Sequence, residues 1–250
     1  MGANFWRDGH ERNIDRERFR GHEQYLGQHG YPYHAMVEYV RKTPRADWIE
    51  VLGEDDAFGC PTEVVDGQVV SRDLLDSIVE IGFLLDVGAL PLDARVLDVG
   101  AGYGRLAARL VQAVERCSVW CCDAIAVSAE VCDRYLRHRD AHPRAMVVAP
   151  EALEEFSSAE PFDLAVNVHS FSECAIDEVR GWLDVLGRLG VRRLFHVPHF
   201  EEMGSNSVER GSGHGESYRP DLEARGWRLA EEWGGPACVP RVYQLWERAP

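Results

Sequence analysis

A turn of glycines that follows an acid is the part of this sequence with the clearest chemistry. It runs Asp98-Val-Gly100-Ala-Gly102-Tyr103-Gly104. Gly100 and Gly102 can adopt positive φ angles, which lets a ligand lie against bare backbone. The spacing Gly-x-Gly-x-Gly differs from the Gly-x-Gly-x-x-Gly of dinucleotide binders. Because an acid before the turn would repel a pyrophosphate, the pattern favours a ligand that carries positive charge.

The residues on either side of the turn predict the elements that must hold it. Val96, Leu97 and Val99 form a short apolar run that is typical of a buried strand. From about Gly104 a helix is predicted, with apolar residues at Leu106, Ala107, Leu110, Val111 and Val114. A strand, a glycine turn and a helix form the first unit of a nucleotide-binding α/β sheet.

The stretch from Asp98 to Gly104 resembles the first motif of class I S-adenosylmethionine (SAM) methyltransferases. In that fold the methionine end of SAM lies over the glycine turn, and the acid helps to hold its ammonium group. The resemblance therefore implies that Asp98, Gly100 and Gly102 bind SAM. It also suggests that Tyr103 packs near the methionine portion. An NAD-dependent oxidoreductase is an alternative that the glycine spacing disfavours.

Two further positions are expected to contact the cofactor. Asp123 ends a predicted strand over residues 118–123 and lies 23 residues after Gly100. An acid near this distance accepts hydrogen bonds from ribose hydroxyls in nucleotide-binding sheets. Glu151 follows a predicted strand over residues 145–148, at the place where the family usually contacts the adenine edge.

Polar side chains gather where a predicted strand over residues 163–169 ends. Asn167 and His169 close this strand, and Glu173 follows shortly after. Ligands of open α/β sheets bind beyond the carboxyl ends of the strands. These side chains should therefore lie next to the transferable methyl group, with Asn167 assigned to cofactor binding.

The catalytic assignment rests on two histidines and one acid. His169 is one candidate base, and His199 follows the predicted strand over residues 193–197. A neutral imidazole is the natural base near pH 7. Glu173 is assigned to orient one of the two rings, and which histidine takes the proton stays open.

A narrower resemblance indicates the acceptor. The pattern Asn-x-x-Ser-Phe-x-Glu from Asn167, together with residues 71–80 and 217–227, resembles sugar O-methyltransferases of bacterial natural-product pathways. The likeness extends over about residues 50–250. It implies methyl transfer to a hydroxyl of a sugar or a glycosylated product, which is a small-molecule partner.

Three alternatives remain open. The acceptor could be a phenol, an amine or a carboxylate, and the chain could be a SAM-binding subunit without catalysis. A divalent metal could assist, with Glu173 and Glu201 or Glu202 as ligands. Because the fourth strand ends in Asn167 and His169 and not in Asp, we assign no metal.

The alternation of elements predicts an α/β fold of the Rossmann-like methyltransferase type. Residues 71–250 should form the SAM-binding domain, a mostly parallel sheet of seven strands with one late antiparallel strand. Residues 1–70 should form an N-terminal helical cap, with helices near 15–26 and 33–41. The long segment over residues 201–217 is expected to be a lid over the acceptor.

Composition limits the remaining possibilities. The net charge of −15 over 250 residues argues against nucleic acids and anionic membranes as partners. The seven cysteines include no C-x-x-C pair, which argues against a structural zinc site and fits a reducing cytoplasm. We expect a cytoplasmic protein without a signal peptide, which could form a homo-oligomer.

Overall fold

The computed structural model describes residues 30–55, 58, 60–156, 160–198, 207–210 and 213–249. For residues 207–210 and 213–215 it describes the backbone only.

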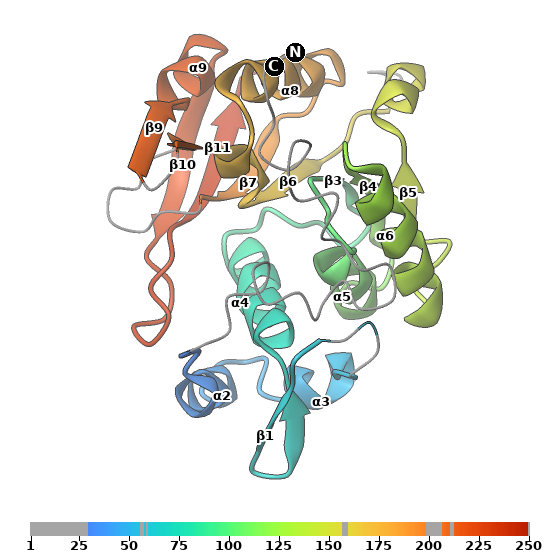
Figure 1. Cartoon of the computed structure of the whole chain (residues 1–250), viewed down its shortest axis with the longest axis vertical. Helices are drawn as coiled ribbons and strands as arrows, with labels where there is room; N and C mark the ends of the chain where they lie inside the picture. Colours follow the sequence, from blue (N-terminus) through green and yellow to red (C-terminus); the bar gives the residue numbers. More distant parts are fainter. Residues whose placement is uncertain are drawn as a thin grey trace.

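A seven-stranded sheet forms the centre of the molecule (Figure 1). Its order is β10-β11-β7-β6-β3-β4-β5. The strands are β3 (Arg95–Val99), β4 (Ser118–Cys122), β5 (Ala145–Val148), β6 (Leu164–Val168), β7 (Arg193–Val197), β10 (Trp227–Trp233) and β11 (Tyr243–Arg248). The neighbours from β7 to β5 pair in parallel, whereas β11 is antiparallel to both β7 and β10. The predicted parallel sheet with one late antiparallel strand is confirmed.

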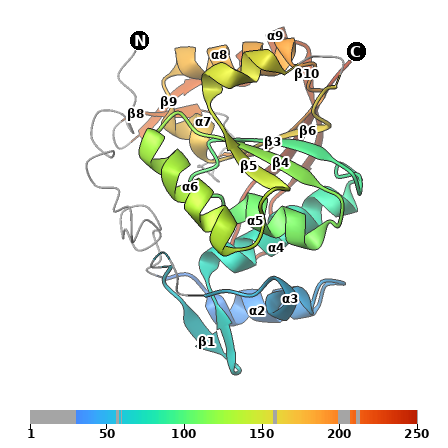
Figure 2. The same ribbon diagram turned by 90° about the vertical axis from the view of Figure 1, so that its right-hand side faces the viewer.

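Helices cover both faces of this sheet, and Figure 2 shows it between α8 and α9 on one side and α4 and α5 on the other. One face packs on α4 (Arg72–Asp86), α5 (Arg105–Ala113) and α6 (Ala126–His138), the other on α8 (Ile176–Arg188) and α9 (Arg219–Ala224). Val96 belongs to the first core and Leu97 to the second, because successive strand residues point to opposite faces.

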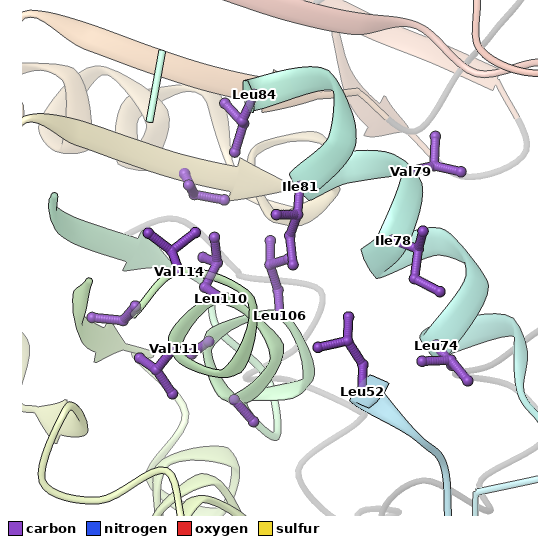
Figure 3. Close-up of a cluster of buried hydrophobic side chains, with 14 of the residues drawn as sticks. Leu52, Leu74, Ile78, Val79, Ile81, Leu84, Leu106, Leu110, Val111 and Val114 are labelled. Carbon is purple, nitrogen blue, oxygen red and sulfur yellow. The ribbon is translucent and has the colours of Figure 1, made fainter. Parts of the chain in front are cut away.

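Helix α4 begins at a side-chain cap. The Ser71 side chain accepts a hydrogen bond from the Leu74 backbone N–H at 2.9 Å, which satisfies one of the free donors at a helix start. Figure 3 shows Ile81 of α4 in the same apolar cluster as Leu106 and Leu110 of α5. This packing fixes α4 beside the helix that follows the glycine turn.

The described portion of the N-terminal part, from residue 30, contains two helices, α2 (Tyr33–Arg41) and α3 (Trp48–Leu52). The predicted helix over 33–41 is confirmed, and the one near 15–26 lies outside the described residues. An unpredicted hairpin follows, made of β1 (Glu63–Val65) and β2 (Gln68–Val70). Its turn residues Asp66 and Gly67 both have positive φ, as an Asp-Gly hairpin turn requires.

The later part of the predicted lid segment is a hairpin and not a loop. Strands β8 (Ser207–Arg210) and β9 (Gly213–Ser217) pair antiparallel. Strand β8 contacts α7 (Ser170–Glu173), the short helix after β6. Residues 201–206, 211 and 212 lie outside the described part, so the lid remains a prediction.

Within the described part of the chain, no helix combines the length and apolar composition needed to cross a membrane.

Candidate active site

Side chains from two helices pack closely against the glycine turn. Gly100 and Gly104 have φ angles of 76° and 86°, which residues other than glycine rarely adopt. A Cβ added at Gly100 would lie 2.2 Å from the Ser170 Oγ of α7, and one at Gly104 2.8 Å from the Cys132 Sγ of α6. Both positions therefore exclude larger residues on steric grounds as well.

A cavity of about 110 Å³ opens over this turn. Three segments line it: the start of α4, the turn itself and the end of β6 with α7. Its charged or polar lining residues include Arg72, Asp73, Asp76, Asp98, Tyr103, Arg105, His169, Ser170 and Glu173. The structure thus brings the predicted cofactor turn and two of the three predicted catalytic residues together.

Asp98 is an acid held away from water. Its side chain comes from β3 and only 4% of the residue is exposed. Burial raises its pKa to about 7; Arg105 opposes this rise, and the nearby carboxylates of Glu80 and Asp123 add to it. A positive group placed against Asp98 would favour its charged form. The position and the electrostatics both suit the predicted contact with an ammonium group.

Asp123 lies at the end of β4 and holds the glycine turn. One carboxylate oxygen accepts the Gly102 N–H at 3.1 Å, and the other accepts the Ile125 N–H at 2.8 Å. Burial raises the pKa of this carboxyl to about 6, although the two backbone hydrogen bonds lower it. Each oxygen keeps a second lone pair. The ribose contact therefore remains a prediction that this geometry permits.

Tyr103 is buried between helices. Its hydroxyl donates to the Asp73 carboxylate, and its ring meets the edge of Tyr135 with centroids 5.0 Å apart. Tyr103 also lines the cavity. Its packing near the methionine portion of SAM stays a prediction.

The side chain of Asn167 forms hydrogen bonds with backbone groups of other segments, which departs from its expected role in cofactor binding. The residue is fully buried. Its side-chain N–H donates to the Val99 carbonyl at 2.9 Å, and its side-chain oxygen accepts the Phe171 N–H at 3.1 Å. Its amide thus joins β6 to the end of β3 and to the start of α7. We assign it a positioning role under the cofactor turn.

His169 faces the cavity from an unusual backbone conformation. Its φ is 67°, which is uncommon for a residue other than glycine and is often found at functional sites. Its N–H donates to the Val197 carbonyl at 2.8 Å, and its own carbonyl accepts the Ser172 N–H at 2.9 Å. These contacts fix the backbone of His169 at the junction of β6 and α7, and both His169 and Glu173 line the cavity.

The neighbouring His196 lies inside the sheet. Its Nδ1–H donates to the Asn167 carbonyl at 3.0 Å, and its Nε2 accepts the Tyr218 hydroxyl hydrogen at 2.7 Å. Burial lowers its pKa to about 4. This ring is therefore neutral near pH 7, and both of its nitrogens already form hydrogen bonds within the protein.

The remaining predicted positions are less informative. Glu151 is exposed in the short helix η5 (Pro150–Glu155) and does not line the cavity. His199 and the possible metal ligands Glu201 and Glu202 lie outside the described residues. Among the residues that are described, no three His, Cys, Asp or Glu side chains are grouped to hold a metal ion.

Sequence analysis missed the contribution of α4 to the cavity. Asp76 accepts hydrogen bonds from the Tyr31 hydroxyl at 2.8 Å and from Arg241 at 2.6 Å, and its carboxylate lies 3.3 Å from Arg72 Nε. Burial raises the pKa of this carboxyl, but the charges of Arg241, Arg72 and Arg105 and the hydrogen bond from Tyr31 hold it below the ordinary value. Segments far apart in sequence thus converge on one carboxylate at the cavity wall.

A second buried ion pair lies one turn further along α4. Arg105 donates to both Glu80 carboxylate oxygens at 2.9 Å. The signal in the sequence was three acids, Asp73, Asp76 and Glu80, at helical spacing among apolar residues. Acids on the buried face of an amphipathic helix require partners.

The comparisons with known proteins concern the domain type and the fold. A family model described as a methyltransferase domain matches residues 96–189. A search of curated proteins found no significant match.

Three solved structures share the fold. Magnesium protoporphyrin IX methyltransferase from Synechocystis PCC 6803, with bound SAM, is 18% identical, with 85% of this chain and 95% of that chain covered and a TM-score of 0.52. A candidate O-methyltransferase from Nostoc punctiforme is 14% identical over 68% of this chain, with a TM-score of 0.53. The match spans about half of that protein, 55%. The cyclase SpnF is 20% identical over 68% of this chain and 64% of its own length, with a TM-score of 0.52.

Identities this low show a shared fold and not a shared substrate. The family match covers the strand that precedes the glycine turn, the turn itself, β6 and α7. Residues 96–189 thus match a methyltransferase domain, and the chain has the fold of a methyltransferase that was solved with bound SAM.

Proposed function

We propose that this protein transfers the methyl group of SAM to a hydroxyl group of a sugar or a glycosylated small molecule. The observation that carries the proposal is the polar wall of the active-site cavity. Arg72, Asp73 and Asp76 face the same space as His169 and Glu173. Carboxylates and guanidinium groups recognise several hydroxyls at once, whereas a flat phenol would favour an apolar wall.

The residues that would hold SAM surround the glycine turn. Asp98 would pair with the ammonium group, and the bare backbone from Gly100 to Gly102 would lie under the methionine chain. Asp123 would accept the ribose hydroxyls with its remaining lone pairs. When bound, SAM supplies an electrophilic methyl group on a sulfonium.

His169 is the base in this proposal. It would take the proton of the acceptor hydroxyl, so that this oxygen could accept the methyl group that bound SAM would supply. Positioned general bases typically contribute about 10²–10⁴-fold to rate, and alignment of the reacting atoms supplies much of the rest. Glu173 orients the ring, and His199 is the alternative base.

The test is an acceptor panel with methyl-labelled SAM. Sugar glycosides, a phenol, an amine and a carboxylic acid are each incubated with the protein, and label transfer is followed by mass spectrometry. We expect label on a glycoside hydroxyl. Label on the phenol, amine or acid alone would contradict the sugar assignment but leave the methyltransferase assignment intact. Transfer to none of them, with SAM bound, would favour a subunit without catalysis.

A further inference from the structure

A second cavity, of about 300 Å³, lies between α2, α4 and the end of β10. It uses the later turns of α4, whereas the active-site cavity uses only the first two. Its walls are mainly apolar and aromatic, formed by Tyr39, Val40, Val79, Phe83, Val87 and Trp233. Figure 3 shows Val79 on the side of α4 that points away from Leu106 and Leu110. Volumes of this size hold small molecules in other proteins.

A glycine in the middle of α4 helps to open this cavity. Gly82 lines it, and its backbone is helical. Glycine is less favourable than alanine inside a helix. A Cβ added here would lie 3.4 Å from the Arg45 side chain, which is ordinary contact, so close packing does not demand the glycine. What Gly82 provides is free space at the cavity wall.

The rim of the cavity carries an excess of negative charge. Asp86, Glu231 and Glu232 line it against one cation, Arg45. Arg45 is bound to both Asp86 oxygens, at 2.6 and 3.2 Å. Glu232 follows Glu231 on β10, so its side chain points to the opposite face of the strand, where it accepts a hydrogen bond from Gln244 at 2.9 Å. Glu231 is therefore the acid on the cavity face of β10, and no cation among the lining residues balances it.

Aromatic rings lie beside Glu231. The planes of Phe83 and Trp233 are inclined by only 7°, with centroids 6.2 Å apart. The face of an aromatic ring attracts cations, and its apolar area favours another ring. Apolar walls, aromatic faces and a negative rim together select a specific kind of ligand.

We propose that this cavity is a binding site for an organic cation with an apolar ring system. The ring contacts Phe83 and Trp233, and the positive group lies toward Glu231. The site is separate from the methyl-transfer site and does not depend on the acceptor proposed above.

The experiment uses thioflavin T, a cationic dye with apolar rings, as the probe on the full chain. Its fluorescence is titrated with the parent protein and with Gly82→Leu, which fills the cavity. We expect Gly82→Leu to weaken binding by at least about tenfold. Gly181→Leu is the matched control, because Gly181 lies on α8 with open space around it, and it should change the dissociation constant by less than about twofold.

A second comparison tests the role of charge. It tests the proposal even if the Gly82→Leu variant does not fold. Glu231→Gln should weaken thioflavin T binding severalfold, whereas Glu63→Gln on the exposed strand β1 should not. The anionic dye anilinonaphthalene sulfonate should bind much more weakly than thioflavin T. Equal binding of the two dyes, no effect of Glu231→Gln, no effect of a folded Gly82→Leu, or displacement of thioflavin T by SAM would each overturn the proposal.

Discussion

Replacing Asp98 with Asn should stabilise the protein alone and weaken its binding of SAM. Asp98 is buried, and its pKa is raised from an ordinary 3.8 to about 7. Ionisation of this carboxyl therefore costs the folded state free energy at neutral pH. Asn has nearly the same shape but no charge, so that Asp98→Asn removes this cost.

The magnitude follows from the shift in pKa. A rise of about 3 units corresponds to about 4 kcal/mol in the free energy of unfolding. A raised carboxyl pKa gives stability that is complete below about pH 4 and is lost as the pH rises to about 7. The advantage of Asp98→Asn over the parent should therefore grow from about pH 4 to pH 7 and then stay constant. The figure is an upper limit, because the Asn amide also needs partners.

The assay is urea unfolding of both proteins at pH 5, 6, 7 and 8, with SAM titrated by calorimetry at pH 8. Losing the charge-assisted hydrogen bond should weaken SAM by about 1.5–3 kcal/mol, or roughly ten- to a hundredfold. Asp93→Asn is the control, because Asp93 is exposed. A stability difference that does not vary with pH would refute the electrostatic reasoning. Unchanged SAM affinity would refute the assignment of Asp98 to the ammonium group.

Four further outcomes are expected. His169→Ala should lower kcat by about 10²–10⁴-fold with little change in SAM affinity; if only His199→Ala does so in a rate assay, the alternative base is correct. A chelator should leave turnover unchanged, and loss of activity that Mg²⁺ restores would establish a metal mechanism. Asn167→Ala leaves two buried backbone groups without their partners and should cost about 1–3 kcal/mol in urea unfolding; no loss would contradict its positioning role. SAM affinity of the parent should fall as the pH drops below about 7, because protonation neutralises Asp98, and calorimetric titrations at several pH values measure this.

Local patterns in the sequence were sufficient to predict most elements of the fold. The predicted strands over 145–148 and 193–197 match β5 and β7 residue for residue. Apolar runs and their spacing carry this information, because they depend on neighbours along the chain. The β1–β2 hairpin departs from the predicted helical cap, although Val-Asp-Gly-Gln is a recognisable turn signal.

The cofactor turn was also predictable, since its glycines are required by local backbone conformation. Positive φ at Gly100 and Gly104 is a property of the turn itself. The contact of Gly100 with Ser170 is different, because the two residues are 70 positions apart. Only the pairing of β3 with β6 brings α7 onto the turn.

The sequence by itself therefore determined the class of fold, the order of most elements and the glycine turn with its acid. The tertiary structure decided which polar side chains face the cavity. Asn167 and His169 are two residues apart, yet Asn167 bonds to the backbone of β3 and α7 while His169 lines the cavity. Likewise, hydrogen bonds from Tyr31 and Arg241 hold the Asp76 carboxylate at the cavity wall. A polar residue signals that it needs a partner, but whether that partner is backbone, another side chain or a ligand depends on segments that only folding brings together.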